Sequence, residues 1–287
     1  MKILISPAKT MVVDEDTFCV KQLPMLLEEA RRLTACLKEL DAESLKKLWG
    51  CSEKLYEENA ARLRETDAEL SRNLTPALIA YEGIQYQYLS PKTLEGDALY
   101  YLEKHLRILS GLYGVLRPMD GIVPYRLEMQ AKLAAFGEKN LYGFWENKLY
   151  DALCDMYQPK TAQGEKPGIG QRTELVRRQT DGLVLFNLAS KEYAKAIEPY
   201  LQKKDRMVTC FFYEEQNGTC KQKATLAKMA RGEMTRFLAQ QQAETPEAAK
   251  EFHSLGFAFC PGRSNETEFV FIKKNEGKPF GRVKRNG

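Results

Sequence analysis

The chain has 287 residues and a mass of 32.8 kDa, enough for one large domain or two small ones with a substantial hydrophobic core. Hydrophobic residues make up 44% and charged residues 29%, which excludes a collagen-like, coiled-coil or wholly disordered chain. The net charge of +4 is too small by itself to indicate a nucleic-acid-binding protein. No stretch approaches the roughly 20 consecutive apolar residues of a membrane helix, and residues 3–5 are too short for a secretory signal. We therefore expect a cytoplasmic protein that does not contact membranes.

Cysteine and histidine give no pattern typical of a metal site. The seven cysteines are scattered without a Cys-x-x-Cys pair, and His105 and His253 are the only histidines. A zinc site of the usual spacing therefore has no ligands from which to be built, and we expect free, mostly buried thiols. The Gly168-x-Gly170 segment lacks the third glycine and the preceding strand of a dinucleotide-binding loop. We expect no bound metal and no cofactor.

Short β-branched or aromatic runs predict the strands. In chain order they are residues 2–6, 183–187, 207–213, 256–260 and 268–273. Asn217-Gly218 predicts a hairpin turn between residues 207–214 and 219–223. Residues 106–109 fit either a buried strand or a helix, because leucines at 102, 106, 109 and 116 also follow the helical period, and both alternatives stay open.

Helices are predicted between these strands. Apolar residues at spacings of three and four from Leu23 to Leu40 predict the first amphipathic helix. Thr75-Pro76, Ser90-Pro91 and Thr245-Pro246 each place a capping side chain before a proline at the first helical position. Because helices and strands interleave, we predict an α/β or mixed α+β class. The expected architecture is a single compact domain, with a mixed sheet surrounded by helices.

Two segments differ in composition from this domain, which we assign to residues 1–273. Residues 158–180 are polar and rich in glycine and proline, which predicts a surface insertion. Residues 274–287 form a basic tail: from Lys273 to the end there are six basic residues against Glu276 alone. Such a tail is either a phosphate-binding arm or a solvated chain end.

Three loops that follow probable buried strands carry small polar and basic side chains. In open α/β sheets ligands gather at the carboxyl ends of the strands, so these loops predict one cationic cleft suited to a phosphate, a nucleotide or a nucleic-acid backbone. Alternatively, the prolines only end the strands, and the arginines pair with carboxylates such as Asp120 and Glu128. The residues expected to converge are Ser6, Lys9, Ser110, Arg117, Arg126, Asn187, Ser190 and Lys191.

Residues 45–55 predict two short helices joined by a turn, close to the helix-hairpin-helix pattern. That pattern offers backbone N–H groups at a helix start to a DNA phosphate. Here Ser52 stands where a second glycine is usual, and many plain helical hairpins look the same. The residues that would contact DNA are Lys46, Lys47, Gly50, Ser52 and Lys54.

Residues 226–238 predict a helix with a basic face made of Lys228, Arg231 and Arg236. Such a face is either solvated or a wall of the same cationic groove. No motif indicates a particular reaction: there is no Gly-x-Ser-x-Gly, no Walker loop and no acidic pair set apart by its spacing. Catalytic residues are therefore unknown, and catalysis by Ser6 or Lys9 stays open.

Several of these segments together resemble the YaaA peroxide-stress-resistance family. They are ISPAKT at 5–10, HLRILSGLYGVLRP at 105–118, PYRLEM at 124–129, NLAS at 187–190 and ARG at 230–232. The resemblance runs in order to about Lys273, and it implies a bacterial cytoplasmic protein that helps cells withstand hydrogen peroxide and lowers free intracellular iron. It further implies a mixed α/β domain with a positively charged cleft and a helix-hairpin-helix element, binding duplex and branched DNA with little sequence preference.

We therefore predict a non-sequence-specific DNA-binding protein of the peroxide stress response. The phosphate contacts on the folded domain would come from Lys9, Lys54, Arg117, Arg126, Lys191, Arg231 and Arg236. The alternative is an enzyme that acts on a nucleotide, a nucleobase or damaged nucleic acid in the cleft, because the loops are richer in small polar groups than phosphate contacts need. Direct iron sequestration is less favoured, since the sequence has no obvious ligand cluster. The oligomeric state stays open.

Overall fold

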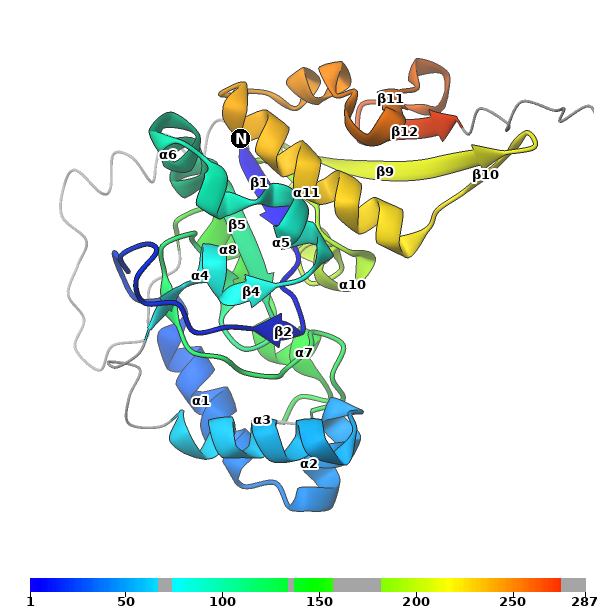
Figure 1. Ribbon diagram of the computed structural model, residues 1–287. Coiled ribbons are helices and arrows are strands. Elements are labelled where there is room, and N and C mark those ends of the chain that lie inside the picture. The colour runs from blue at the N-terminus through cyan, green and yellow to red at the C-terminus, as the bar shows by residue number, and fades with distance from the viewer. Residues whose placement is uncertain (67–73, 134–136, 157–181, 275–287) are drawn as a thin grey trace, which may run out of the picture.

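A mixed sheet of eight strands runs through the molecule (Figure 1). The structure is a computed structural model that describes residues 1–66, 74–133, 137–156 and 182–274, so the predicted insertion at 158–180 and residues 275–287 lie outside it. The strands follow the order β11-β12-β9-β8-β1-β5-β6, and β10 pairs with β9. Their bounds are β1 Lys2–Ile5, β5 Leu106–Ser110, β6 Gly114–Leu116, β8 Val184–Leu188, β9 Arg206–Gln216, β10 Thr219–Lys221, β11 Phe257–Phe259 and β12 Glu268–Lys274.

The five central strands, from β12 to β5, are parallel, whereas β11 and β6 pair antiparallel with their neighbours. β1 lies between β5 and β8, and Ile5 at its end pairs with Ile108 and Leu188. β1 and β5 are buried along almost their whole length, as near-continuous apolar strands of parallel sheets are. The predicted mixed α/β class is therefore confirmed, and each of the five predicted strands exists with boundaries close to the expected ones.

Helices and short strand pairs surround this sheet. The α-helices are α1 Leu27–Lys38, α2 Ala42–Trp49, α3 Glu53–Glu65, α4 Ala77–Ala80, α5 Ile84–Leu89, α6 Gly96–His105, α7 Leu141–Trp145, α8 Lys148–Leu153, α10 Lys191–Ala194 and α11 Ala224–Gln240. The 3-10 helices are η1 Pro91–Thr93, η2 Glu198–Tyr200, η3 Pro246–Glu251, η4 Ser254–Gly256 and η5 Pro261–Arg263. The short strands are β2 Thr10–Met11 with β4 Tyr81–Glu82, and β3 Thr75–Pro76 with β7 Gly121–Ile122.

The segment left open between helix and strand contains both. α6 ends at His105 and β5 begins at the next residue, so the leucines that share one helical period belong to two different elements. The Asn217-Gly218 hairpin is confirmed: both residues have positive φ, 50° and 73°, as a two-residue hairpin turn requires.

Two helix starts differ from the prediction. α1 begins at Leu27 rather than at Leu23, which is 45% exposed. Leu23 precedes a proline, and the residue before proline is disfavoured in helical conformation. Thr75-Pro76 forms the short strand β3 and not a helix start, although α4 follows directly. The other two proline sites begin 3-10 helices as expected, but without a side-chain cap hydrogen bond.

α2 and α3 form a helical hairpin next to α1, at one end of the molecule (Figure 1). The Asp41 carboxylate accepts a hydrogen bond from the Ser44 N–H at 2.7 Å and caps the start of α2. Gly50 ends α2 in the left-handed conformation, with φ of 51°, and Ser52 is the N-cap residue of α3 without a side-chain cap bond. The helix pair is thus as predicted, whereas its assignment as a DNA-binding helix-hairpin-helix element stays a prediction.

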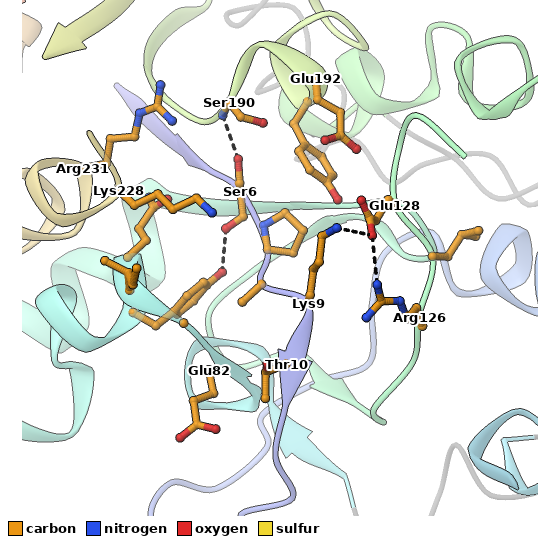
Figure 2. Close-up of a pocket in the computed structure, with 18 of the residues that line it drawn as sticks. Ser6, Lys9, Thr10, Glu82, Arg126, Glu128, Ser190, Glu192, Lys228 and Arg231 are labelled. Atoms are coloured by element: carbon orange, nitrogen blue, oxygen red, sulfur yellow. Dashed lines mark hydrogen bonds and ion pairs between the residues drawn. The ribbon is translucent and has the colours of Figure 1, made fainter. Parts of the chain in front are cut away.

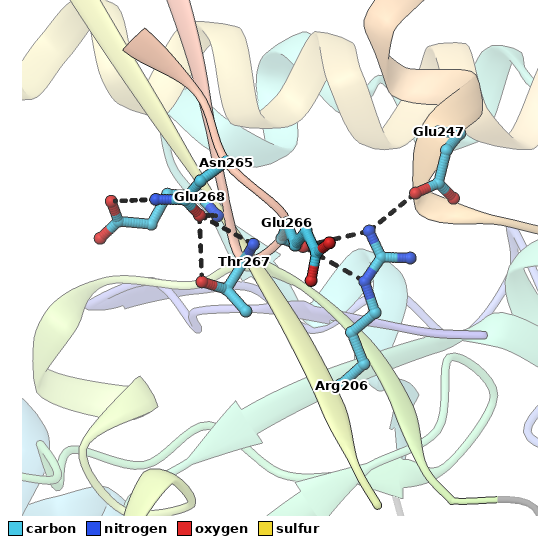
Figure 3. Close-up of polar contacts among 6 residues, drawn as sticks. All are labelled: Arg206, Glu247, Asn265, Glu266, Thr267 and Glu268. Carbon is cyan, nitrogen blue, oxygen red and sulfur yellow. Dashed lines mark hydrogen bonds and ion pairs between the residues drawn. The ribbon is translucent and has the colours of Figure 1, made fainter.

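The amino ends of β9 and β12 are fixed by their own polar contacts (Figure 3). The Arg206 guanidinium, at the start of β9, donates to Glu247 Oε1 at 2.7 Å and to the Glu266 carbonyl at 3.0 Å. Asn265 Oδ1 accepts from the N–H groups of Thr267 and Glu268 and closes the turn that leads into β12. At this end of the sheet, Arg206 and Asn265 thus find their partners within the chain.

α11 crosses the molecule in front of β9 and packs mainly against α5 (Figure 1). The two helices are in close backbone contact at Gly232, where a Cβ atom would lie 2.1 Å from the Gln85 carbonyl oxygen and 2.9 Å from the Leu89 nitrogen. Only glycine therefore permits this backbone contact, which fixes where α11 stands over the sheet.

We expect Gly232→Ala to lower the free energy of unfolding by about 1–3 kcal/mol, because the added methyl group overpacks a backbone contact that cannot yield. Urea unfolding followed by circular dichroism measures the change. Gly96→Ala is the matched control: it also lies in a helix, but nothing is within 4 Å of its Cβ position, so its stability should stay close to that of the unchanged protein. Equal unfolding midpoints for the two variants would contradict the proposed close packing.

Candidate functional site

A cavity of about 440 Å³ lies at the carboxyl ends of β1 and β8, bounded also by α5 and α11 (Figure 2). Ser6 follows β1 directly, and Ser190 stands between β8 and α10. Both line the cavity. The position agrees with the expectation that ligands gather at the carboxyl ends of parallel strands.

Ser6 is held from two sides at the centre of the cavity (Figure 2). Its hydroxyl oxygen accepts a hydrogen bond from the Ser190 N–H at 2.8 Å, and its carbonyl accepts one from the Tyr86 hydroxyl at 3.0 Å. The first bond joins the loops after β1 and β8. Because this hydroxyl already accepts, its own proton remains to be donated to a group in the cavity.

Asn187 and Ser110 act beneath the cavity and do not line it. Asn187 accepts from the Ala189 N–H at 2.9 Å and so shapes the loop after β8. The Ser110 oxygen accepts from the N–H of Tyr113 at 2.9 Å and lies 2.6 Å from the Tyr125 hydroxyl. Tyr125 does line the cavity, and burial raises its pKa to about 12, so it stays protonated. Two of the predicted polar residues therefore support the site from below.

Glu128 neutralises two of the predicted phosphate-binding residues. Its Oε1 lies 2.9 Å from Lys9 Nζ and 3.5 Å from an Arg126 guanidinium nitrogen. All three residues line the cavity. The alternative derived from the sequence, in which the cations of these loops pair with carboxylates, thus describes this side of the cavity.

Arg117 and Arg236 are occupied by structural contacts away from the cavity lining. The Arg117 guanidinium bonds the buried Asp120 carboxylate at 2.8 Å and the Leu23 carbonyl at 2.8 Å. Arg236 donates to the Ser90 carbonyl at 3.1 Å and to the Thr93 hydroxyl at 2.9 Å, where α5 passes into η1. Both arginines join segments far apart in the sequence, so their first role in the fold is to hold those segments together.

Lys228 and Arg231 reach the cavity from α11, and no carboxylate within the described ranges pairs with either. Figure 2 shows the Lys228 ammonium turned toward Ser6. The Nε atom of Arg231 is buried and has no hydrogen-bond partner among the described residues. Burial lowers the pKa of Arg231, although arginine keeps its charge at neutral pH. One wall of the cavity thus carries two cations that are not neutralised.

Three carboxylates, Glu82, Glu128 and Glu192, also line the cavity. Burial raises the pKa of Glu192, and the neighbouring charge of Glu128 raises it further, whereas Lys9 lowers it. The lining therefore holds four cationic and three acidic side chains, a more mixed site than the cationic cleft that we expected. Glu82 and Glu192 were not predicted, because neither has a recognisable spacing to another acidic residue.

The family of the chain is shown by comparison with known proteins. A family model described as peroxide stress protein YaaA matches residues 1–263. The chain belongs to this family. It is 45% identical over 273 residues to a UPF0246 protein of Pediococcus pentosaceus, with 95% of this chain and 98% of the relative covered. A UPF0246 protein of Agathobacter rectalis is 41% identical, with 96% of this chain and 99% of the relative covered. A UPF0246 protein of Limosilactobacillus reuteri is 44% identical, with 94% of this chain and 98% of the relative covered.

The hairpin of this YaaA-family chain lies beside the cavity and not within its lining. Lys47, Gly50, Ser52 and Lys54 are exposed, and Lys46 pairs with Glu53 at 2.7 Å. Lys191, the first residue of α10, is also exposed outside the lining. The structure thus brings Lys228 together with Ser6, Lys9, Arg126, Ser190 and Arg231 around the cavity, and it places Ser110 and Asn187 directly beneath. The other predicted site residues lie outside the lining.

The described ranges of the YaaA-family chain contain neither a helix that could span a membrane nor a cluster of metal ligands. None of the helices there is long and apolar enough to cross a membrane. The same ranges contain no group of three or more histidine, cysteine or acidic residues placed to hold a metal ion, and their cysteines are free thiols.

The raised pKa of Glu192 predicts a pH-dependent stability. The folded YaaA-family chain keeps a proton on this carboxyl at pH values where the unfolded chain, with the ordinary pKa of 4.5, has released it. Because the folded state then binds more protons, stability falls as pH rises above 4.5. Glu192→Gln imitates the protonated form, so its stability relative to the unchanged protein should increase over the same window. Urea unfolding at a series of pH values measures this difference, and a difference that does not change with pH would show that Glu192 titrates normally.

Proposed function

We propose that this peroxide stress protein binds duplex or branched DNA without sequence preference, in the cytoplasm, through contacts with the phosphates. The observation that carries the proposal is the pair of cations on α11. Lys228 and Arg231 face the cavity, and within the described ranges no carboxylate neutralises them. Phosphate contacts of this kind position nucleic acid without reading its bases, so they supply affinity and little specificity.

The α2–α3 hairpin supports a second contact with the same DNA. One nitrogen of Arg126 lies 3.5 Å from the Trp49 carbonyl, next to the turn at Gly50, and 3.5 Å from the Glu128 carboxylate in the cavity. The hairpin turn and the cavity are therefore neighbours. A duplex that meets the exposed Lys47 and Lys54 would also pass the cavity mouth, and contacts at both places would add to its affinity.

Protection against peroxide would follow from DNA binding, with the effect on free iron arising indirectly. Within the described ranges, acidic, histidine and cysteine side chains do not gather in groups suited to a metal, and this supports an indirect route. A tight, stoichiometric complex of the purified protein with Fe(II) would replace this proposal by direct iron sequestration.

Titration of a fluorescently labelled duplex, followed by anisotropy at several salt concentrations, tests the DNA-binding proposal. We expect the affinity to fall steeply with salt, since each phosphate contact adds about 0.9 to the slope of log affinity against log salt. Lys228→Ala should weaken binding to every sequence alike and reduce that slope by about one contact. Lys203→Ala is the matched control, because this exposed lysine carries the same charge outside the cavity lining. Equal affinities of the two variants would contradict a role for the cavity.

The basic tail is tested in the same titration. A variant that ends at Lys274 keeps β12 intact and removes the residues that follow it. Salt-sensitive binding that survives this truncation supports a site on the folded domain. If DNA binding disappears when the tail is removed, residues 275–287 and not the cavity bind DNA.

A second candidate function is an enzyme acting on a nucleotide, a nucleobase or damaged nucleic acid. The observation that favours it is the pair Glu192 and Glu128, two carboxyl groups in one cavity with different surroundings. Burial raises the pKa of Glu192, whereas Glu128 is fixed by Lys9 and Arg126, and such differences are typical of acid–base pairs. Product formation from a panel of nucleotides and damaged oligonucleotides, abolished in Glu192→Gln and retained in Lys203→Ala, would establish it. Intact substrates across the panel would exclude it for those substrates.

A further inference from the structure

We propose that the cavity binds one nucleotide unit, with its phosphate against Ser6 and Lys228 and its base toward Glu192. This nucleotide site deepens the proposed function. It rests on the proposed DNA binding only where the nucleotide comes from DNA. Two sources can supply a nucleotide: a free mononucleotide, or one residue turned out of a DNA strand. The chemistry that the cavity recognises is the same in both cases, and the experiments below separate the sources.

The size of the cavity favours a compact ligand. Its volume of about 440 Å³ falls in the range of roughly 300–1,000 Å³ that is usual for small-molecule sites. A duplex can touch the mouth of such a cavity, but its stacked bases cannot reach groups inside. Enzymes and other proteins that contact a single base inside a pocket do so with a base that has left the stack. The inner polar groups of this cavity therefore suit one nucleotide better than a continuous helix.

The two sides of the cavity differ in charge, and this difference sets the orientation of a bound ligand. Figure 2 shows Lys228 and Arg231 on one side of Ser6, and Glu128 and Glu192 on the other, together with Lys9 and Arg126, which pair with Glu128. On the first side the Ser6 hydroxyl has its proton to donate, so this side presents hydrogen-bond donors and positive charge. A phosphate, which offers only acceptors and negative charge near neutral pH, matches that side.

The acidic side suits the hydrogen-bond-donating edge of a base. Glu192 accepts a bond from the Gln130 N–H at 3.1 Å and interacts with the Met129 backbone, and a carboxylate can accept further bonds from amino or imino groups. Glu128 is occupied by Lys9 and Arg126, so Glu192 is the carboxylate with more capacity left for a ligand. Inorganic phosphate would satisfy only the cationic side, and a simple amine only the acidic side, whereas a nucleotide satisfies both.

Gln85 provides an independent sign that the cavity is built for a polar ligand. Its side chain is 7% exposed and lines the cavity, and its Nε2 has no hydrogen-bond partner among the residues described. Arg231 Nε, on the same lining, is likewise buried without one. A buried donor without a partner is unfavourable for the folded state, so a ligand that accepts these bonds would offset that cost. Tyr86, Tyr125 and Tyr193 add aromatic surface on which a base can stack.

Isothermal titration calorimetry with nucleoside monophosphates of each base tests the proposal. We expect one site per chain. A nucleoside, which lacks the phosphate, should bind at least tenfold more weakly than the monophosphate, and so should inorganic phosphate, which lacks the base. Lys228→Ala should weaken the monophosphate at least fivefold and leave the nucleoside almost unchanged. Glu192→Gln should reduce the differences in affinity among the bases and leave inorganic phosphate unchanged. Lys203→Ala should match the unchanged protein throughout.

A duplex containing a single 2-aminopurine serves as the second arm, because the fluorescence of this base rises when it leaves the stack. A rise at saturating protein, reduced in Lys228→Ala and unchanged in Lys203→Ala, identifies DNA as a source even if free monophosphates do not bind. Monophosphate binding without any duplex binding supports the nucleotide site and overturns the proposed DNA function. Salt-dependent duplex binding with neither monophosphate binding nor a fluorescence rise supports DNA binding and overturns the nucleotide site.

Discussion

The parallel pairing of β1 with both β5 and β8 is the constraint on which the site depends. β1 has only four residues, yet it stands between the two other strands whose loops supply polar groups. Because all three run in the same direction, their carboxyl ends meet at one edge of the sheet. The Ser6–Ser190 hydrogen bond then joins two of those ends directly. Without the parallel alignment, residues separated by more than 180 positions in the sequence would have no reason to share a cavity.

Much of this arrangement follows from the sequence, because strands and their ends leave local signals. The short apolar runs gave the five predicted strands, and the small polar residues after them gave the position of the cavity. Ser6, Lys9, Arg126 and Ser190 were found in this way, whereas Lys228 and Arg231 were found from the basic face of the predicted helix at 226–238. Local signals rarely contain a partner from a distant segment. Arg117 pairs with the nearby Asp120, which the sequence allowed as an alternative, but the carbonyl groups that Arg117 and Arg236 also bond come from segments far away in the chain.

Local sequence signals also failed to predict two acidic residues of the cavity. Glu82 enters from the short strand β4, and Glu192 from α10, so only the tertiary structure brings them together. Their presence changes what the site can do. A groove lined only by cations would attract any phosphate backbone, whereas two cations that no described carboxylate pairs with on one side, and carboxylates balanced by Lys9 and Arg126 on the other, favour a ligand with two unlike ends. Specificity of this kind arises from the difference between the two sides and not from total charge.

α11 connects the stability of the fold to the chemistry of the cavity. Gly232 allows its backbone to approach the end of α5 more closely than any side chain would permit, and Arg231 is the residue immediately before it. Keeping the Arg231 guanidinium in a largely buried position opposes its hydration, as the lowered pKa indicates. A buried cation without a carboxylate partner is unfavourable for folding alone. The packing of α11 on α5 therefore holds in place a charge that no described carboxylate neutralises, and an anionic ligand in the cavity is the partner that would offset its cost.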